Sequence, residues 1–537
     1  MTRARPRARH VFARLAAAGI LAVAAGCTGG APADAKKPGT LRILAGSELS
    51  DLAPILREAT KATGVSVKLD YAGTLDGVQQ VLGGTAGGRH DAIWFSSNRY
   101  LTLRPDGQSR LGPSVKIMSS PVVLGLRAST AHRLGWDRTR PSWAAIAAAA
   151  SAGKFTYGMT DPASSNSGFS ALVGVAAALS GTGAALDGPT IDRVAPQLKG
   201  FFTAQRLTAG SSGWLSDTYA RDPSRVDGLV NYESVLLGLN AARRLPEPLT
   251  VVYPSDGVVT ADYPLTLLSS ASSGAGDAFR RLTGYLRRAD VQRKIMTQTH
   301  RRPADPDVRP GAEFAAQPPE LPFPARADAV DALIDAFFNR LRRPARTVYV
   351  LDVSGSMEGA RLASLKTALT ALTGADSTLA GRFQRFHDRE EVTLLPFSTR
   401  PGSPATYVLP PSRPEAELAR IRGFAQSLTA GGATAIYDSL EQAFSVAVRP
   451  AGGEADRFTS IVLMSDGESN KGASADSFRA WYAGQPPQLK RIPVFTVLFG
   501  ESAIGQMTTL AQLTQGRTFD ARTQSLSVVF KEIRGYQ

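Results

Sequence analysis

The sequence predicts two α/β domains, each built on a mostly parallel β-sheet. Apolar strands alternate with amphipathic helical patterns in two stretches, residues 41–302 and residues 346–537. Such alternation is typical of parallel sheets that helices cover on both faces. A segment with many prolines separates the two stretches, and proline resists both helix and sheet. A chain of 537 residues is also too long for one ordinary hydrophobic core.

The first 27 residues have the pattern of a secretory signal. Basic residues occur throughout residues 2–14, and the apolar segment 15–25 follows them. This segment is too short to span a bilayer with ease, but it has the length of a signal-peptide core. Cys27 is the only cysteine of the chain, so no disulfide can form within one chain and the thiol needs another explanation.

The stretch 23–27, VAAGC, resembles the lipobox of bacterial lipoproteins. The resemblance implies that residues 1–27 are a lipoprotein signal peptide. It also implies that Cys27 is lipidated and anchors the chain to the cell membrane on its extracytoplasmic face. Ala24 departs from the family pattern, in which leucine is usual, and the alternative is an ordinary signal peptide with a chance cysteine. Residues 28–40, rich in Gly, Ala, Pro and Lys, are expected to form a flexible tether.

The net charge of the chain is +15, from 61 basic and 46 acidic residues. The basic residues of the chain body form no stripe with interleaved aromatic residues, which is the pattern typical of nucleic-acid binding. We therefore expect no nucleic-acid partner. The composition favours a basic protein that works near an anionic surface.

The first domain begins with a strand–helix alternation. Strands are expected at residues 41–44, 65–71 and 91–95, and helices at residues 49–63 and 75–82. Ligands of open parallel sheets bind at the carboxyl ends of the strands. Those ends carry small, hydroxyl-rich residues here, at positions 46–47, 73–74 and 96–98.

Two later stretches also fit a binding cleft. Residues 161–169, DPASSNSGF, precede a helical pattern over 170–179, and residues 229–234, LVNYES, predict a strand-to-helix turn. Hydroxyls and free backbone N–H groups at a helix start can bind an anion. The alternative for each stretch, taken alone, is a helix cap without a ligand.

The order of these stretches resembles the extracellular solute-binding proteins of ABC importers, in particular the sulfate- and molybdate-type group. The resemblance rests further on residues 141–143 (PSW), 252–257 (VYPSDG), 262–264 (DYP) and a closing helical segment over 277–299. It implies a two-lobed, periplasmic-binding-protein-like domain of type II over residues 41–302. Its two-stranded hinge is expected near residues 115–126 and 249–268.

The resemblance also implies which side chains face the cleft between the lobes. They are Ser47, Thr74, Ser97, Ser165, Ser167 and Tyr232. Neutral hydroxyls and amides would hold an oxyanion, and a small organic solute is an alternative ligand. A further alternative is a domain kept only as a docking module, without any ligand.

Residues 303–345 are expected to link the two domains. Prolines make the first part of this segment a semi-rigid spacer. Residues 328–342 then have the pattern of an amphipathic helix, and Pro344 ends it.

The second domain repeats the alternation. Strands are expected at residues 348–351, 391–397, 460–464 and 493–499. Helices are expected at residues 360–372, 415–428, 439–448, 507–514 and 526–533. Three loops at strand ends or helix starts present oxygen ligands: Asp352, Ser354 and Ser356 in the first, Thr434 in the second, and Asp466 in the third. Such ligands suit a small, hard cation, above all Mg²⁺.

These loops resemble the metal-ion-dependent adhesion site of the von Willebrand factor A (VWA) domain. The resemblance covers residues 346–537, and all five family positions carry the usual residue type in the usual order. It implies a doubly wound Rossmann-like fold and a bound Mg²⁺, or another divalent cation such as Mn²⁺ or Ca²⁺. It also implies a protein partner that supplies a carboxylate to the metal. The alternative is a domain that keeps the loops as turns and binds no metal.

Catalysis is not expected. The chain has only 5 histidines, and it contains no G-x-S-x-G, H-E-x-x-H or P-loop motif. We therefore predict a membrane-anchored binding protein with a role in adhesion or in scaffolding an envelope complex. The alternative is a substrate-binding lipoprotein of an ABC transporter, in which the VWA domain only positions the solute-binding domain.

Overall fold

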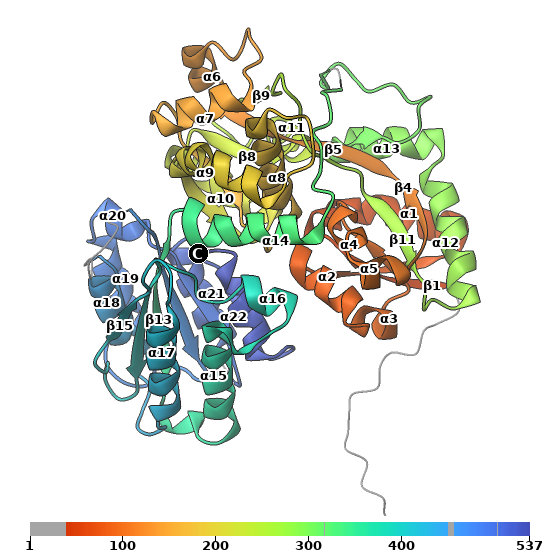
Figure 1. Ribbon diagram of the computed structural model, residues 1–537. Helices are drawn as coiled ribbons and strands as arrows, with labels where there is room; N and C mark the ends of the chain where they lie inside the picture. The colour runs from red at the N-terminus through yellow and green to blue at the C-terminus, as the bar shows by residue number, and fades with distance from the viewer. Residues whose placement is uncertain (1–38, 316, 449–455, 502) are drawn as a thin grey trace, which may run out of the picture. The chain divides into compact units, whose positions relative to one another are not determined.

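The computed structural model describes residues 39–315, 317–448, 456–501 and 503–537 (Figure 1). The predicted signal peptide, the lipidation site Cys27 and nearly all of the predicted tether lie outside these residues. Within them, no helix has both the length and the apolar character that a membrane crossing requires.

The first lobe is built on a five-stranded sheet with the strand order β2-β1-β3-β11-β4. The first three of these strands run parallel, and β11 runs antiparallel to both of its neighbours. The strands are β2 (Ser66–Tyr71), β1 (Thr40–Ala45), β3 (Ala92–Trp94), β11 (Pro264–Leu268) and β4 (Leu111–Lys116). The helices are η1 (Ser47–Leu52), α1 (Ala53–Thr63), α2 (Thr74–Leu82), α3 (Thr85–Arg89), α4 (Arg99–Thr102), α5 (Pro105–Ser109), α12 (Ser273–Leu286) and α13 (Ala289–Thr299).

The second lobe is built around the long strand β5 (Met118–Arg127), of which all but the last residue are buried. The strand order is β10-β5-β8-β6-β7, and two more strands, β9 and β12, also pair with β5. The further strands are β10 (Thr260–Ala261), β8 (Gly228–Tyr232), β6 (Tyr157–Thr160), β7 (Gln205–Ala209), β9 (Leu249–Val252) and β12 (Arg302–Pro303). The helices are α6 (Ala128–Leu134), α7 (Trp143–Ser151), α8 (Asn166–Ser180), α9 (Gly188–Thr203), α10 (Ser212–Arg221) and α11 (Glu233–Ala241).

The chain passes between the two sheets three times. Two passages are short: Ile117, between β4 and β5, and Asp262 and Tyr263, between β10 and β11. Both of these fall inside the segments expected to form the hinge. The third passage follows α13 and leads to β12, which pairs with β5. Two short connections side by side between the sheets give the lobes the geometry of a hinged pair.

The linker helix consists of α14 (Ala327–Ala336) and the π-helical turn Phe337–Leu341. It buries one apolar side, as the amphipathic pattern predicts. It also bonds to both lobes, because Asp331 Oδ1 accepts a hydrogen bond of 2.6 Å from Tyr100 of the first lobe and Arg340 pairs with Asp192 of the second.

The C-terminal domain starts at the strand β13 (Ala345–Asp352), which is buried along its whole length. Its sheet has the order β15-β14-β13-β16-β17-β18, and every pair is parallel except β14–β15. The other strands are β14 (Glu391–Phe397), β15 (Ala405–Val408), β16 (Phe458–Ser465), β17 (Val494–Leu498) and β18 (Thr518–Asp520).

Helices cover both faces of this sheet. The first face packs against α15 (Ala360–Thr370), α17 (Glu415–Ser427) and α22 (Leu526–Arg534). The second packs against α18 (Ile436–Ala447), α19 (Ala475–Ala483) and α21 (Ile504–Leu513). Two short helices, α16 (Leu379–Phe383) and α20 (Pro487–Lys490), lie in connections. The predicted α/β class, with a doubly wound second domain, is confirmed. The sequence analysis missed β15, β18 and α19.

Candidate functional site

The predicted metal ligands lie at the carboxyl edge of the C-terminal sheet. Asp352 is the last residue of β13, and Asp466 follows the last residue of β16. These strands are parallel neighbours, and Leu351 is paired with Met464. The two buried carboxylates therefore leave the sheet at the same edge, as the alternation of strands and helices predicted.

Hydrogen bonds join four of the five predicted ligands into one network. Ser354 Oγ lies 3.1 Å from Ser356 Oγ, and Ser356 Oγ donates to Asp466 Oδ1 at 2.8 Å. The backbone N–H of Ser354 donates to Asp352 Oδ1 at 2.8 Å. Ser465, which the sequence analysis missed, donates its hydroxyl to Asp352 Oδ2 at 2.5 Å. The structure thus brings oxygen atoms from the first and third loops together.

The loop with the fifth ligand, Thr434, is bonded to both of the others. Gly355 N donates to Gly432 O at 2.9 Å, which fixes the second loop against the first. The backbone N–H of Thr434 donates to Asn470 Oδ1 at 2.9 Å, which fixes it against the third. The Thr434 side chain itself is buried.

The site contains two buried carboxylates, those of Asp352 and Asp466, and one cationic side chain, that of Arg361. Burial raises the pKa of Asp352, and the nearby charge of Asp466 adds to the rise. Arg361, at the start of α15, donates from Nη1 to Asp466 Oδ2 at 2.5 Å. The side chain of Asp352 is bonded only to neutral donors. A buried carboxylate without a cationic partner is costly, so the site favours a further cation.

The donor set fits a hard divalent cation. Two carboxylates and three hydroxyls are oxygen ligands, which Mg²⁺ prefers, and they leave room for water or an outside ligand. Among the described residues, no group of three or more His, Cys, Asp or Glu side chains is placed to hold a metal.

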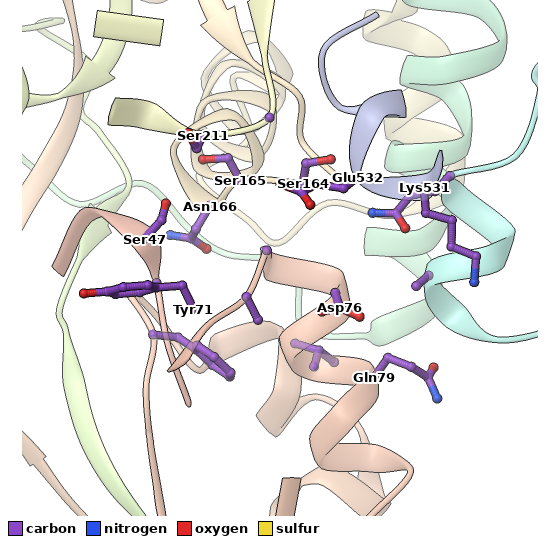
Figure 2. Close-up of a pocket in the computed structure, with 18 of the residues that line it drawn as sticks. Ser47, Tyr71, Asp76, Gln79, Ser164, Ser165, Asn166, Ser211, Lys531 and Glu532 are labelled. Atoms are coloured by element: carbon purple, nitrogen blue, oxygen red, sulfur yellow. The ribbon is translucent and has the colours of Figure 1, made fainter. Parts of the chain in front are cut away.

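A second candidate site is a cavity of about 510 Å³ between the lobes, which we call the cleft cavity (Figure 2). Its size is in the range of small-ligand sites. Three of the six predicted cleft residues, Ser47, Ser97 and Ser165, line it. Ser47 begins η1 directly after β1, and Ser165 directly precedes α8, so both lie at strand-to-helix turns.

The other predicted cleft residues lie elsewhere. Ser167 is fully buried and bonds to Thr160 Oγ1 and Ser212 Oγ, both at 2.7 Å. Tyr232 is also buried, and its hydroxyl donates to Ser96 Oγ of the first lobe at 3.0 Å. Neither is among the lining residues. Thr74 begins α2, and its side chain is not among those that the structure describes.

The sequence analysis missed the charged residues of the cleft cavity. Glu48 and Asp76 come from the first lobe, and Arg517, Lys531 and Glu532 come from the C-terminal domain. Figure 2 shows Lys531 and Glu532 at the same space as Ser164 and Ser165 of the second lobe. No sequence signal marks these residues, because 441 positions or more separate the charged residues of the first lobe from those of the C-terminal domain.

Two family models match the chain. Residues 41–298 match the bacterial extracellular solute-binding protein family, and residues 347–468 match the von Willebrand factor type A domain. Both agree with the resemblances seen in the sequence. A search of curated proteins gives no match.

Solved structures are similar to parts of this chain at low sequence identity. The ferric binding protein from Campylobacter jejuni is 12% identical, with a TM-score of 0.44, and the match covers 55% of this chain and 98% of that one. The sulfate-binding protein SubI from Mycobacterium tuberculosis is 19% identical (TM-score 0.38; 53% and 93% covered). A von Willebrand factor type A protein from Catenulispora acidiphila is 17% identical (TM-score 0.28; 36% and 42% covered).

Likenesses with TM-scores this low assign neither a function nor a ligand. The family models carry the identification: the first covers the strands of both lobes except β12, and the second covers the strands from β13 to β16. The chain therefore contains an extracellular solute-binding domain followed by a VWA domain.

Proposed function

We propose that this protein is a binding protein of the cell envelope, anchored through a lipid on Cys27, which grips a protein partner through a divalent cation. The observation that supports this most directly is the network of Asp352, Ser354, Ser356 and Asp466 at one sheet edge. The solute-binding domain holds a small solute in the cleft cavity or serves as a docking module. The roles are adhesion or scaffolding, without catalysis.

When bound, the cation would act as a Lewis acid that accepts a carboxylate from the partner. Asp352 and Asp466 would hold it by charge, and Ser354, Ser356 and Thr434 by their hydroxyl oxygens. Because these five side chains supply fewer oxygen ligands than the six that Mg²⁺ prefers, a bound cation would keep a position for water or for a ligand from the partner. Metal and partner therefore strengthen each other's binding, by thermodynamic linkage.

The test is Asp352→Ala in the whole chain. We expect Mg²⁺ to raise the melting temperature of the wild type and to leave that of the variant unchanged. Capture of a partner from envelope extracts should need Mg²⁺ and fail with the variant. Asp476→Ala is the matched control, because Asp476 is an exposed residue of α19 and is not one of the five predicted ligands. Partner capture that persists after a chelator has removed Mg²⁺ would contradict the metal-dependent mechanism.

The anchor is tested separately. Cys27→Ser should move the protein from the membrane fraction to the soluble extracytoplasmic fraction, because a single serine hydroxyl cannot take the thioether-linked lipid. An unchanged membrane fraction would contradict the lipid anchor. It would leave the metal site untouched.

The second candidate function is delivery of a solute to an ABC permease. The cleft cavity between two hinged lobes favours it. In that case loss of the metal site should leave solute uptake by cells unchanged, whereas a blocked cleft cavity should abolish it.

A further inference from the structure

The cleft cavity has walls from three parts of the chain. The first lobe contributes the turn after β1 and the start of α2, and the second contributes the segment before α8. The third wall is the C-terminal domain, through α16, α22 and the residues after α22. Figure 2 shows side chains of all three around the same space.

Direct contacts hold the third wall in place. Leu379 N of α16 donates to Gln79 Oε1 of α2 at 3.0 Å. On the other side, the ring of Tyr536 packs edge-on against Trp214 of the second lobe, with ring centres 5.0 Å apart. The C-terminal domain thus touches both lobes at the cavity, and α22 lies where a ligand would meet it.

The side chains that line the cavity include more acidic groups than basic groups. Three carboxyl groups line it, from Glu48, Asp76 and Glu532, against two cationic groups. Both cations are already engaged: Lys531 pairs with Asp376, and Arg517 Nη2 lies 3.2 Å from Glu532 Oε1.

Glu48 and Asp76 form no ion pair with any residue that the structure describes. Burial raises the pKa of each of them, and it also raises the pKa of Glu532. The charge of Arg301 opposes the rise in the pKa of Glu48, but the guanidinium of Arg301 is bound to Asp51 at 2.7 Å. The cavity therefore offers a ligand carboxylate oxygens that accept no hydrogen bond from a charged group.

Aromatic side chains are a further feature of the cavity wall. Tyr71, Phe95 and Tyr100 line the cavity, and aromatic faces attract cations. Ser164 also lines it, but its hydroxyl is packed against the C-terminal segment, because a Cβ at Gly535 would lie 2.3 Å from Ser164 Oγ. The aromatic rings therefore favour a cationic ligand.

We propose that the cleft cavity binds a small organic cation and that the C-terminal domain, through Glu532 and α22, forms part of the binding site. An oxyanion would meet Glu48 and Asp76 with no free cation to offset them. An amine brings the donors and the charge that the cavity lacks. The inference rests on the proposed solute-binding role and deepens it.

The ligand class is tested by titrating the whole chain with choline and putrescine as organic cations. Sulfate and molybdate serve as oxyanions and glucose as a neutral solute. We expect heat of binding and a rise in melting temperature with a cation only. Binding of an oxyanion or of glucose, without binding of a cation, overturns the inference and leaves the solute-binding role standing. Absence of binding by all five probes overturns both.

The first-lobe contribution is tested with Glu48→Gln and Asp76→Asn. Each should weaken cation binding by about tenfold or more, since a charge-assisted hydrogen bond is lost. Asp476→Asn, on an exposed helix, is the matched control and should change nothing. Unchanged cation affinity in both cavity variants overturns the assignment of the ligand's charge.

The third wall is tested with Glu532→Gln and with Val528→Trp. Val528 lines the cavity, is 40% exposed, and lies in α22, so a larger side chain there fills the space without a core position being changed. We expect weaker cation binding in the first variant and none in the second, with Mg²⁺ stabilisation retained as the sign of correct folding. Cation affinity unchanged in both would show that the lobes alone form the site.

Discussion

At the scale of single residues, Arg361 is the feature that the metal site's family resemblance does not include. Its guanidinium bonds to Asp466 Oδ2, an atom that would face a bound cation. The guanidinium of Arg361 and a bound cation would then compete for the one buried carboxylate of Asp466. Arg361 is one-third exposed, so it can swing outward when a metal takes its place. The same charge is then free to meet the acidic group of a partner.

Arg361→Ala is therefore expected to tighten Mg²⁺ binding, by about tenfold, which is of the order of one lost charge-assisted contact. The metal-free protein should become less stable, because Asp466 loses its partner. Calorimetric titration with Mg²⁺ or Mn²⁺ measures the first effect, and thermal unfolding in chelator measures the second.

Arg479→Ala is the control for this change, because Arg479 makes a comparable pair with Asp476 on an exposed helix surface. It should leave the metal affinity as in the wild type. An Arg361→Ala variant that binds the metal no more tightly than this control would show that the arginine does not compete.

Residue by residue, the clustering of the predicted metal ligands follows from the sequence, whereas only three of the six predicted cleft residues line the cleft cavity. Asp352, Ser354 and Ser356 lie within five consecutive positions, and strand order alone brings Asp466 beside them. By contrast, Glu532 reaches the cavity only through the docking of one domain on another. Local patterns carry no information on such docking, and hydroxyl-rich turns such as 164–167 do not reveal which side chain is buried in the core.

At the scale of elements, the linker helix joins the C-terminal domain through a buried ring pair. Phe338 of the π-helical turn stacks on His387, with ring centres 4.4 Å apart and planes 6° from parallel. Arg342 and Arg534 both pair with the buried carboxylate of Glu390 nearby. Burial and these two arginines lower the pKa of His387 well below its ordinary value.

This histidine makes the stability pH-dependent. Its folded-state pKa is depressed, so the unfolded chain takes up the proton first as the pH falls below about 6.5. This residue should then lower the free energy of unfolding by about 1.4 kcal/mol for each unit by which the pH falls. His387→Phe keeps the ring stack and should reduce the slope between pH 6.5 and 5, measured by urea unfolding.

The absolute stability of this variant is a poor readout, because the bond between His387 Nε2 and Phe383 O, 3.1 Å long, is also lost. The slope is the proper comparison, and above pH 7.5 the two proteins should show the same slope. Equal slopes below pH 6.5 as well would contradict the assignment to His387.

The elements themselves were predicted where their patterns are long. β13, β14 and β16 are continuous apolar runs, and the helix expected at 526–533 lies within one residue of α22. In the second lobe, β6 and β7, of four and five residues, were not predicted. In the C-terminal domain, the strands that were not predicted, β15 and β18, have four and three residues and lie at the sheet edges. An edge strand of that length has too few residues to show an alternation.

At the scale of the whole described chain, a glycine permits the close approach of the C-terminal segment to the second lobe. A Cβ added at Gly535 would lie 2.3 Å from Ser164 Oγ and 2.7 Å from Ser164 Cβ. The backbone at Gly535 has a φ of −67°, which any residue can adopt, so only the lack of space for a side chain disfavours other residues there. The packing of the C-terminal domain against the second lobe depends on this close contact.

Gly535→Ala is expected to destabilise the protein by about 1–3 kcal/mol, the usual cost of overpacking. The second change Ser164→Gly should restore much of that loss, since it removes the clashing atoms, and the double-mutant cycle measures the coupling. Thermal and urea unfolding of the four proteins give the values.

Gly423→Ala is the control substitution. Gly423 lies inside α17, and a Cβ there meets no heavy atom within 4 Å, so the change should stabilise the helix by up to about 1 kcal/mol. Additive effects of Gly535→Ala and Ser164→Gly would contradict a direct clash between the two positions.

The contacts of the C-terminal domain with both lobes have a kinetic consequence. A hinge that opens by rotating the lobes apart must first break either the bond from Leu379 to Gln79 or the packing of Tyr536 on Trp214. Exchange of a captured solute would then wait for the C-terminal domain to release one of the two lobes. Long residence times, rather than tight equilibrium binding, are what such a doubly held cleft provides.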